Sequence, residues 1–169
     1  MSAIAGLHWY AIYTSSRSEK IVCARLQKEG IDVFLPLIKK QRQWSDRKKW
    51  IDAPLFSSYI FVHIIATDYH KVLSVPGVVK FVTFEGKAVS IPEKQLNDIK
   101  AMLMSGYDIE STGEHFTEGD KIKISAGPLI GMQGFFVNYR GNQKVMIRID
   151  QIGQNILVNV PATMLTKAK

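Results

Sequence analysis

A polar stretch in the second half of the sequence, SGYDIESTGEHFTE at residues 105–118, divides the chain into two parts of different texture. It contains two glycines and few aliphatic side chains, so it is typical of a linker rather than of a packed core. Before it, patterns of strands and helices alternate. After it, no helical pattern of useful length occurs. We therefore expect two domains, residues 1–106 and 118–169, joined by a linker at residues 107–117.

The first part predicts an α+β layer sandwich. The aromatic run at 8–14 and the apolar run at 56–65 are typical of buried strands. Ser16 and Glu19 have the spacing of a capping box and predict a helix that ends at Gly30. The remaining predicted elements are strands at 31–38 and 78–84 and helices at 68–73 and 92–104.

The segment KKQRQWSDRKKW at residues 39–50 contains six Lys or Arg side chains and one Asp. Ser45-Asp46 lies at its centre and favours a turn, so the segment predicts a basic hairpin. Over the whole chain the net charge is +7 and the sequence pI is about 9.5. Such a charge favours contact with nucleic acid or another polyanion and says nothing about the fold.

The second part predicts a small all-β barrel of about 55 residues, a size at which a single domain still folds alone. Glycines separate short runs that alternate in polarity or are apolar. These runs are 121–125, 135–139, 144–149 and 156–160, within an expected set of five short strands.

The composition excludes several classes of protein. Hydrophobic residues make up 46% of the chain, which is enough for packed cores and too many for a disordered chain. Cys23 is the single cysteine, so no internal disulfide can form, and we expect a small core side chain there. The N-terminal sequence MSAIAGLHWY lacks the pattern of a secretory signal, and no apolar stretch approaches membrane-spanning length. We therefore expect a cytoplasmic protein, a monomer that contacts no membrane.

No residue pattern predicts an enzyme. The four histidines, at positions 8, 63, 70 and 115, have no metal-ligand spacing with one another or with Cys23. No Ser/His/Asp or Cys/His arrangement is recognisable. We expect a binding protein that has no catalytic residue, no metal and no cofactor.

Four motifs, each a weak signal alone, occur in an order and spacing that resemble the NusG family of transcription elongation and antitermination factors. They are His8-Trp9-Tyr10 with Tyr13 and Glu19-Lys20 behind it, Pro54–Val62 (PLFSSYIFV), Ser74–Val78 before Phe81, and the KOW-like segments Gly119–Ile124 and Gly127–Gly134. The resemblance implies an N-terminal NusG-type α/β sandwich and a C-terminal KOW barrel of SH3-like form. Ser57-Ser58, where many members carry Pro-Gly, makes the chain more similar to specialised paralogues of the RfaH and UpxY type, which act at chosen operons.

The resemblance implies that the N-terminal domain binds RNA polymerase at the clamp helices of its largest subunit and suppresses pausing and termination. Operons for polysaccharide biosynthesis are the expected targets. The residues that match the family's polymerase-binding positions are Tyr13, Phe56, Tyr59, Phe81 and Phe84, with His70 and Lys71 reaching the far side of the cleft. For the aromatic residues, the alternative interpretation is that they are ordinary core.

The basic residues are expected to meet nucleic acid. Those near the first helix, which match the family surface for non-template DNA, are Arg17, Lys20 and Arg25; those of the hairpin are Lys39, Lys40, Arg42, Arg47, Lys48 and Lys49. Trp44 and Trp50 stand among these charges, where they can stack on bases or support the hairpin. The alternative is that the charges form a solvated face.

The barrel is expected to be a partner module. In the general factor, a loop aromatic followed by Gly binds ribosomal protein S10 or the terminator Rho; the matching pair here is Ile152-Gly153. An aliphatic residue at that place favours loss of Rho binding, which would suit an antiterminator. The alternative function is a ribosome-associated RNA-binding KOW protein, which the basic charge permits and the Trp-Tyr and Leu-Phe-x-x-Tyr motifs disfavour.

Overall fold

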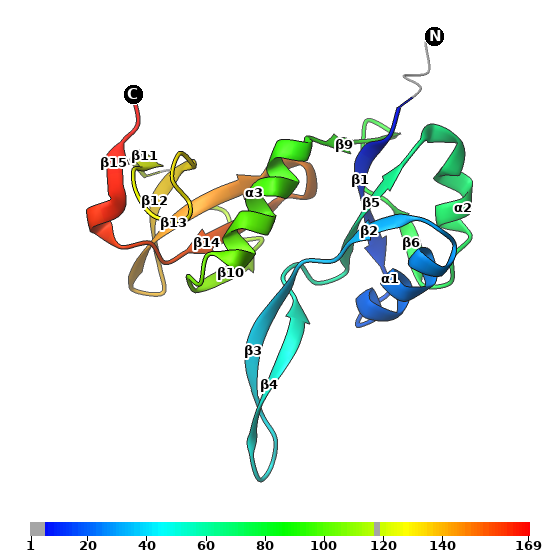
Figure 1. The fold of residues 1–169 in the computed structure, drawn as a ribbon, viewed down its shortest axis with the longest axis horizontal. Helices are drawn as coiled ribbons and strands as arrows, with labels where there is room; N and C mark the ends of the chain where they lie inside the picture. Colours follow the sequence, from blue (N-terminus) through cyan, green and yellow to red (C-terminus); the bar gives the residue numbers. More distant parts are fainter. Residues whose placement is uncertain (1–5, 117–118) are drawn as a thin grey trace. The chain divides into compact units, whose positions relative to one another are not determined.

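The computed structural model describes residues 6–116 and 119–169. Figure 1 shows the course of the chain. By its internal contacts the chain divides into two compact units between Glu93 and Lys94. The α+β fold class expected from the sequence is confirmed. Three parts of the expectations lie outside the described residues: the first five residues of the predicted N-terminus, residue 117 of the linker and residue 118 of the barrel domain.

The first unit is built on an antiparallel sheet with β1 (His8–Thr14) and β5 (Tyr59–Ile64) at its centre. Its order is β2-β5-β1-β6, with β9 also paired to β1. The outer strands are β2 (Asp32–Phe34), β6 (Val78–Phe81) and β9 (Ser90–Ile91). The register sets Tyr13 opposite Tyr59 and Trp9 opposite His63, so these side chains share one face of the sheet.

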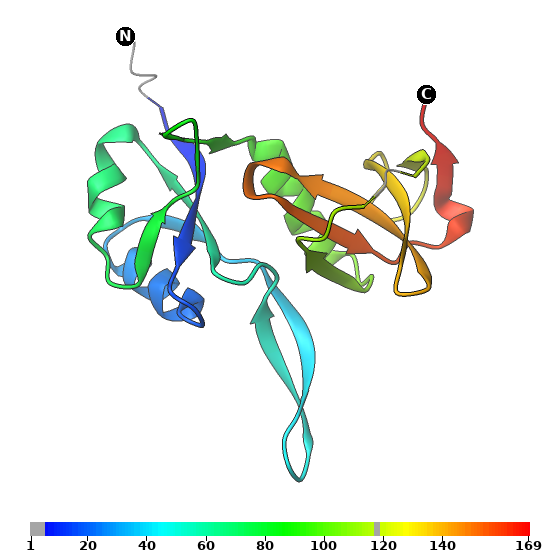
Figure 2. The same ribbon diagram turned by 180° about the vertical axis from the view of Figure 1, so that it is seen from behind.

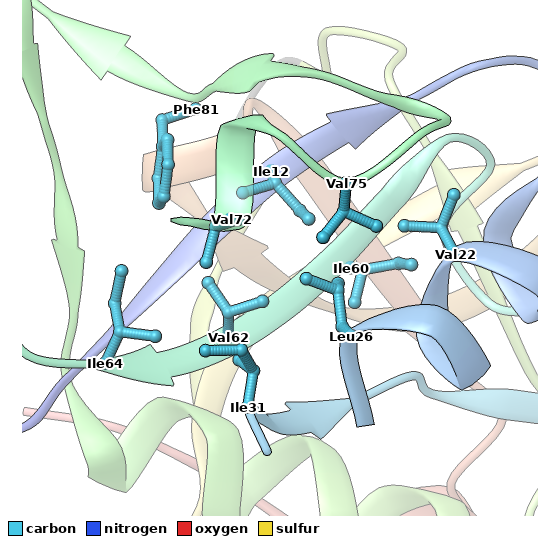
Figure 3. Close-up of a cluster of buried hydrophobic side chains, with 10 residues drawn as sticks. All are labelled: Ile12, Val22, Leu26, Ile31, Ile60, Val62, Ile64, Val72, Val75 and Phe81. Carbon is cyan, nitrogen blue, oxygen red and sulfur yellow. The ribbon is translucent and has the colours of Figure 1, made fainter. Parts of the chain in front are cut away.

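Two helices cover the other face. They are α1 (Glu19–Lys28) and α2 (Tyr69–Leu73), and the short helix η1 (Ala66–Asp68) leads into the second. The core lies between these helices and the sheet, as Figure 3 shows. Ile60, Val62 and Ile64 point into it from β5. Alternating residues of a strand point to opposite faces, so Tyr59, Phe61 and His63 point the other way, as the alternation in the sequence predicts.

The basic segment forms a two-stranded hairpin, as expected. Its strands are β3 (Leu37–Gln43) and β4 (Lys48–Pro54). The turn is closed by the Trp44 N–H, which donates to the Arg47 carbonyl at 2.8 Å. Figures 1 and 2 show the hairpin extending away from the sheet of its own unit. A second, short hairpin joins β7 (Thr83–Phe84) to β8 (Lys87–Ala88).

The second unit contains most of helix α3 (Glu93–Met104) and a six-stranded sheet of order β10-β14-β13-β12-β11-β15. The strands are β10 (Ile109–Thr112), β11 (Lys121–Ile124), β12 (Gln133–Tyr139), β13 (Asn142–Ile149), β14 (Gln154–Val158) and β15 (Leu165–Lys167), with helices η2 (Asp150–Ile152) and η3 (Ala162–Met164) between them. Gly134 is required here, because a Cβ at that position would lie 2.5 Å from the Met146 carbonyl oxygen.

The structure differs from the sequence expectations at the linker. Residues 109–112 of the expected linker form β10, which pairs with β14 along four residue pairs. The Asn159 N–H donates to the Asp108 carbonyl at 3.0 Å, and Glu110 forms an ion pair with the half-buried Lys144. The polar composition hid this strand, because its partners lie more than thirty residues further along the chain. The expected strand at 31–38 is likewise divided at Pro36 into β2 and β3.

The expected capping box at the first helix is wrong. Helix α1 begins at Glu19 with Ser18 as its N-cap, and no side chain caps it. Arg17 has a φ of 59°, so the backbone turns into the helix only after that residue. The carboxylate of Glu19 instead accepts a hydrogen bond from the Ser58 N–H at 2.8 Å. A contact between residues 39 positions apart leaves no local signal in the sequence.

Candidate functional site

The face of the sheet that α1 and α2 leave uncovered is lined with aromatic rings from β1 and β5. We call it the aromatic face, defined by Trp9, Tyr13, Tyr59, Phe61 and His63. The Trp9 and His63 rings stack with centroids 4.6 Å apart, and the Tyr13 and Tyr59 rings lie 4.7 Å apart. Both tyrosines are half-buried, whereas Phe61 is fully buried. Tyr13, Tyr59 and the equally half-buried His63 therefore form the part of this face that a partner can reach.

A tight turn sets the position of Tyr59. Ser58, immediately before it, has a φ of 65°, in the left-handed region. Its N–H is held by the buried Glu19 carboxylate, and its carbonyl accepts from the Thr14 N–H at 2.9 Å. Burial, together with a hydrogen bond to Tyr13, raises the pKa of the Tyr59 hydroxyl well above its usual range. The Tyr59 hydroxyl thus stays neutral at physiological pH.

The structure brings together only some of the residues predicted to bind polymerase. Phe56 is 1% exposed and packs edge-on against Phe61, 6.1 Å between centroids, so it supports the aromatic face from within. Phe81 is also 1% exposed, but it lies in the core beneath the helices, stacked on Tyr69 at 4.2 Å. Its side chain is therefore not available to a partner. Phe84 is 70% exposed at the tip of the β7–β8 hairpin.

His70 and Lys71 are exposed on α2. The Lys71 ammonium donates to the Glu29 carbonyl at 2.6 Å, which ties α2 to the end of α1. Lys71 therefore has a structural role in addition to any contact with a partner. His70 packs edge-on against Tyr69, with centroids 5.7 Å apart.

A groove of about 510 Å³ runs between the start of α1 and the base of the basic hairpin. We call it the basic groove. Its lining residues are Arg17, Glu19, Lys20, Lys40, Gln41, Arg42, Ile51, Asp52, Ala53, Pro54 and Ser57. The four cations outnumber the two carboxylates, so the groove attracts anions. Arg17, Lys20, Lys40 and Arg42 come from both predicted sets of nucleic-acid-binding residues, and the structure brings these four together.

The two faces of the hairpin differ in character. Arg42 pairs with Lys49 across the strands, and Lys40 lies two residues before Arg42, so these three side chains share one face of the hairpin. Lys40 and Arg42 also line the basic groove. Trp50 pairs with Gln41 and points to the opposite face, where it is 65% exposed. Trp44 is 51% exposed near the tip, and the Arg42 guanidinium lies 6.0 Å from its ring.

Some predicted nucleic-acid contacts have structural partners instead. The Lys20 ammonium donates to the Asp52 carbonyl at 2.6 Å, and Lys39 forms an ion pair with the Asp52 carboxylate at 2.7 Å. The hydrogen bond from Lys39 lowers the pKa of Asp52. Arg25 donates to the Pro76 carbonyl at 2.7 Å and so holds the turn before β6. Arg47, Lys48 and the rest of the hairpin tip are exposed.

The pair Ile152-Gly153, expected to bind a partner, lies in the turn between β13 and β14. Ile152 is 5% exposed, so its side chain packs inside the barrel and does not present itself to a partner. Gly153 is exposed and has a φ of 61°, a conformation that glycine adopts without strain. Ile152 is the last residue of η2 and the buried residue of that short helix.

No group of three or more His, Cys, Asp or Glu side chains that can hold a metal ion occurs within residues 6–116 and 119–169. No helix in those ranges is both long and apolar enough to cross a membrane. The residue that sequence reasoning missed is Glu19, which connects the basic groove to the turn before Tyr59. The sequence shows an acidic residue at the start of a helix, but it gives no sign that the partner of Glu19 is the distant Ser58.

The first unit thus carries an aromatic face and a basic groove, and comparison with known proteins shows to which family this chain belongs. A family model described as "Transcription termination factor nusG" matches residues 7–100, more than half of the chain. The chain therefore belongs to the NusG family, whose members are transcription elongation and termination factors rather than enzymes.

The chain also matches solved structures. One described as "Domain interaction in Thermotoga maritima NusG" matches with a TM-score of 0.60 and 24% identity, covering 96% of this chain and 98% of that chain. Another, "Crystal Structure of MjSpt4:Spt5 complex conformation A", matches with a TM-score of 0.33 and 16% identity, covering 95% of this chain and 97% of that chain. The first likeness supports the two-part fold.

Proposed function

We propose that this protein binds RNA polymerase through the aromatic face and suppresses pausing and termination at specific operons, such as those for polysaccharide biosynthesis. The observation that carries the proposal is the Tyr13–Tyr59 pair, half-buried on a sheet face that α1 and α2 do not cover. Aromatic side chains bury a large area and lose little conformational entropy on binding. The clamp helices of the largest polymerase subunit are the proposed partner.

The mechanism requires no bond-making. A polymerase whose clamp is closed resists pausing, and a factor that binds the closed state more tightly shifts the equilibrium toward it. Phe84, which is exposed, is proposed to extend the contact beyond the tyrosine pair. His70 and Lys71, which are exposed on α2, are proposed to reach the far side of the polymerase cleft. Phe56 supports the surface from below, and the buried Phe81 has no direct part in it.

The basic groove is proposed to hold the phosphate backbone of the non-template DNA strand. Lys40, Arg42 and Lys49 share one face of the hairpin and Arg17 faces them from the start of α1, which supports this role. Phosphate contacts bind without reading sequence. The Arg25 guanidinium is engaged by Pro76, so the proposal assigns the groove to affinity rather than to sequence recognition.

Ribosomal protein S10 is the proposed partner of the C-terminal barrel. This part of the proposal rests on the KOW-like motif alone. Because the Ile152 side chain is buried, it cannot anchor the partner. The proposed contact is therefore with the outer surface of the loop that contains Ile152. The lack of an exposed aromatic at this position supports the absence of Rho binding. A factor that does not recruit Rho favours readthrough over termination.

The test of polymerase binding is a pull-down of purified core RNA polymerase with the full chain. We expect the double variant Tyr13→Ala/Tyr59→Ala to lose binding by at least tenfold, because two aromatic anchors are removed. The matched control is Ile21→Ala, which removes a 54% exposed side chain from the outer surface of α1. Equal binding by wild type and a folded double variant would refute the role of the aromatic face. Binding to ribosomal RNA in place of polymerase would favour the ribosomal alternative.

The test of the basic groove is the salt dependence of binding to single-stranded DNA. Replacing Lys40, Arg42 and Lys49 with Gln should reduce the slope of log K against log salt by about 2, at roughly 0.7 per lost phosphate contact. The matched control replaces with Gln three exposed lysines that do not line the groove, namely Lys28, Lys87 and Lys121. A slope that changes equally in both triple variants would mean that only net charge matters.

A further inference from the structure

Glu19 is an unusual residue at the start of a helix. An acidic side chain in the first turn normally stays in water, where it interacts with the helix dipole. Glu19 is only 7% exposed, and its carboxylate accepts from the Ser58 N–H at 2.8 Å, across 39 residues of sequence. A buried carboxylate is costly unless hydrogen bonds compensate its lost hydration. Its position therefore indicates a specific task at Ser58.

The task is defined by the backbone of Ser58. With a φ of 65°, this residue is in a conformation that non-glycine residues adopt only when their surroundings hold it there. It is held on both sides: Glu19 accepts from its N–H, and its carbonyl accepts from the Thr14 N–H at 2.9 Å. Tyr59 follows Ser58 directly, and Tyr13 precedes Thr14 directly. The two hydrogen bonds therefore flank the tyrosine pair.

We propose that Glu19 is a positioning residue for the polymerase-binding surface: its carboxylate holds Ser58 in the left-handed conformation and thereby sets the Tyr13–Tyr59 pair for its partner. The effect on polymerase binding rests on the proposed function, whereas the effect on the geometry of the tyrosine pair does not. Without the acceptor, Ser58 relaxes toward ordinary φ, the direction of the strand entering at Tyr59 changes, and the ring contact at 4.7 Å is lost.

The position of Glu19 in the wall of the basic groove offers a competing role, in which its charge acts only on the cations of the groove. The variants Glu19→Gln and Glu19→Ala separate the two. The Gln side chain keeps an oxygen that accepts from the Ser58 N–H and loses the charge, whereas Ala loses both. A positioning role follows the hydrogen bond; an electrostatic role follows the charge.

The first experiment needs no polymerase. Proton NMR of the full chain measures the contact between the Tyr13 and Tyr59 rings, with Tyr59→Phe used to assign the signals. We expect the ring contact in wild type and in Glu19→Gln, and its loss in Glu19→Ala. An intact ring contact in Glu19→Ala would overturn the proposal. This result stands whether or not the protein binds polymerase, so it separates failure of the inference from failure of the proposed function.

The second experiment measures affinity for core RNA polymerase. Removing a charge-assisted hydrogen bond should weaken binding about tenfold in Glu19→Ala, whereas Glu19→Gln should weaken it only about threefold. Ser58→Gly removes the strain that Glu19 holds, so in the Ser58→Gly background Glu19→Ala should weaken binding by less than about threefold. This background also keeps the test valid if Glu19→Ala alone fails to fold. Equal losses in the Gln and Ala variants, or no coupling to Ser58→Gly, would overturn the positioning role.

Discussion

Replacing Ser58 with Gly should stabilise the first unit. Ser58 has a φ of 65°, where the Cβ of any L-residue approaches the backbone. Glycine has no Cβ and adopts this region freely. Neither of the two hydrogen bonds of Ser58 uses its side chain, because they involve its N–H and its carbonyl. The substitution therefore relieves strain and keeps both contacts.

The magnitude follows from two opposing terms. A left-handed conformation costs an L-residue about 1–2 kcal/mol relative to glycine. Glycine in turn makes the unfolded chain more flexible, which costs about 0.5–1 kcal/mol. The central values of the two terms leave a net gain of about 0.75 kcal/mol in the free energy of unfolding. For a unit of this size that corresponds to a rise in Tm of about 3–6 °C.

Differential scanning calorimetry of the full chain measures the effect, with the transition of the first unit as the readout. The matched control is Ser57→Gly, at the neighbouring exposed residue, where φ is not positive. There only the entropic cost applies, so Tm should fall slightly. A lower Tm for Ser58→Gly, or equal changes in the two variants, would refute the claim that the turn before Tyr59 is strained.

Three further substitutions test the packing of each unit. Gly77→Ala should lower the stability of the first unit by about 2–4 kcal/mol, because φ is 97° and the new Cβ would lie 2.5 Å from a valine methyl of α1; a urea melt that matches wild type would contradict this. Gly134→Ala should lower the Tm of the barrel alone, since its Cβ would lie 2.5 Å from a backbone oxygen of β13, and a parallel fall in the first unit would show that the two units unfold together. Lys39 lowers the pKa of Asp52. The stabilisation that Asp52 contributes should therefore be fully present above its ordinary pKa and lost as the pH falls through the lowered value. Asp52→Asn should abolish this acid step in a pH titration followed by NMR.

The local patterns of the sequence predicted most of the elements. The basic hairpin with its central turn, the helix after Pro92 and the β-rich second half all appear in the structure. The alternation in β5 also predicted which side chains share a face, because the side-chain direction in a strand depends only on its period of two. The predicted site residues stay predictions, but the structure shows which of them lie together: Tyr13 with Tyr59, and Arg17 with Lys40.

Other features depended on contacts between residues distant in sequence. Phe81 and Tyr59 are both aromatic residues in apolar strands of the sequence. Phe81 nevertheless lies beneath the helices and Tyr59 on the opposite face, because strand pairing and helix placement decide which face the helices cover. The polar residues of β10 became a strand only because β14 offered an unpaired edge.

The sequence by itself determined the α+β class, the charge of the hairpin and the resemblance to one family, since each depends on composition, periodicity or motif order. Only the tertiary structure decided that Glu19 reaches Ser58 instead of capping its own helix, and that Ile152 is buried. The physical reason is that a hydrogen-bond acceptor is selected by distance in space. Residues 39 positions apart can meet in many folds, and only the packed sheet brings these two within 2.8 Å.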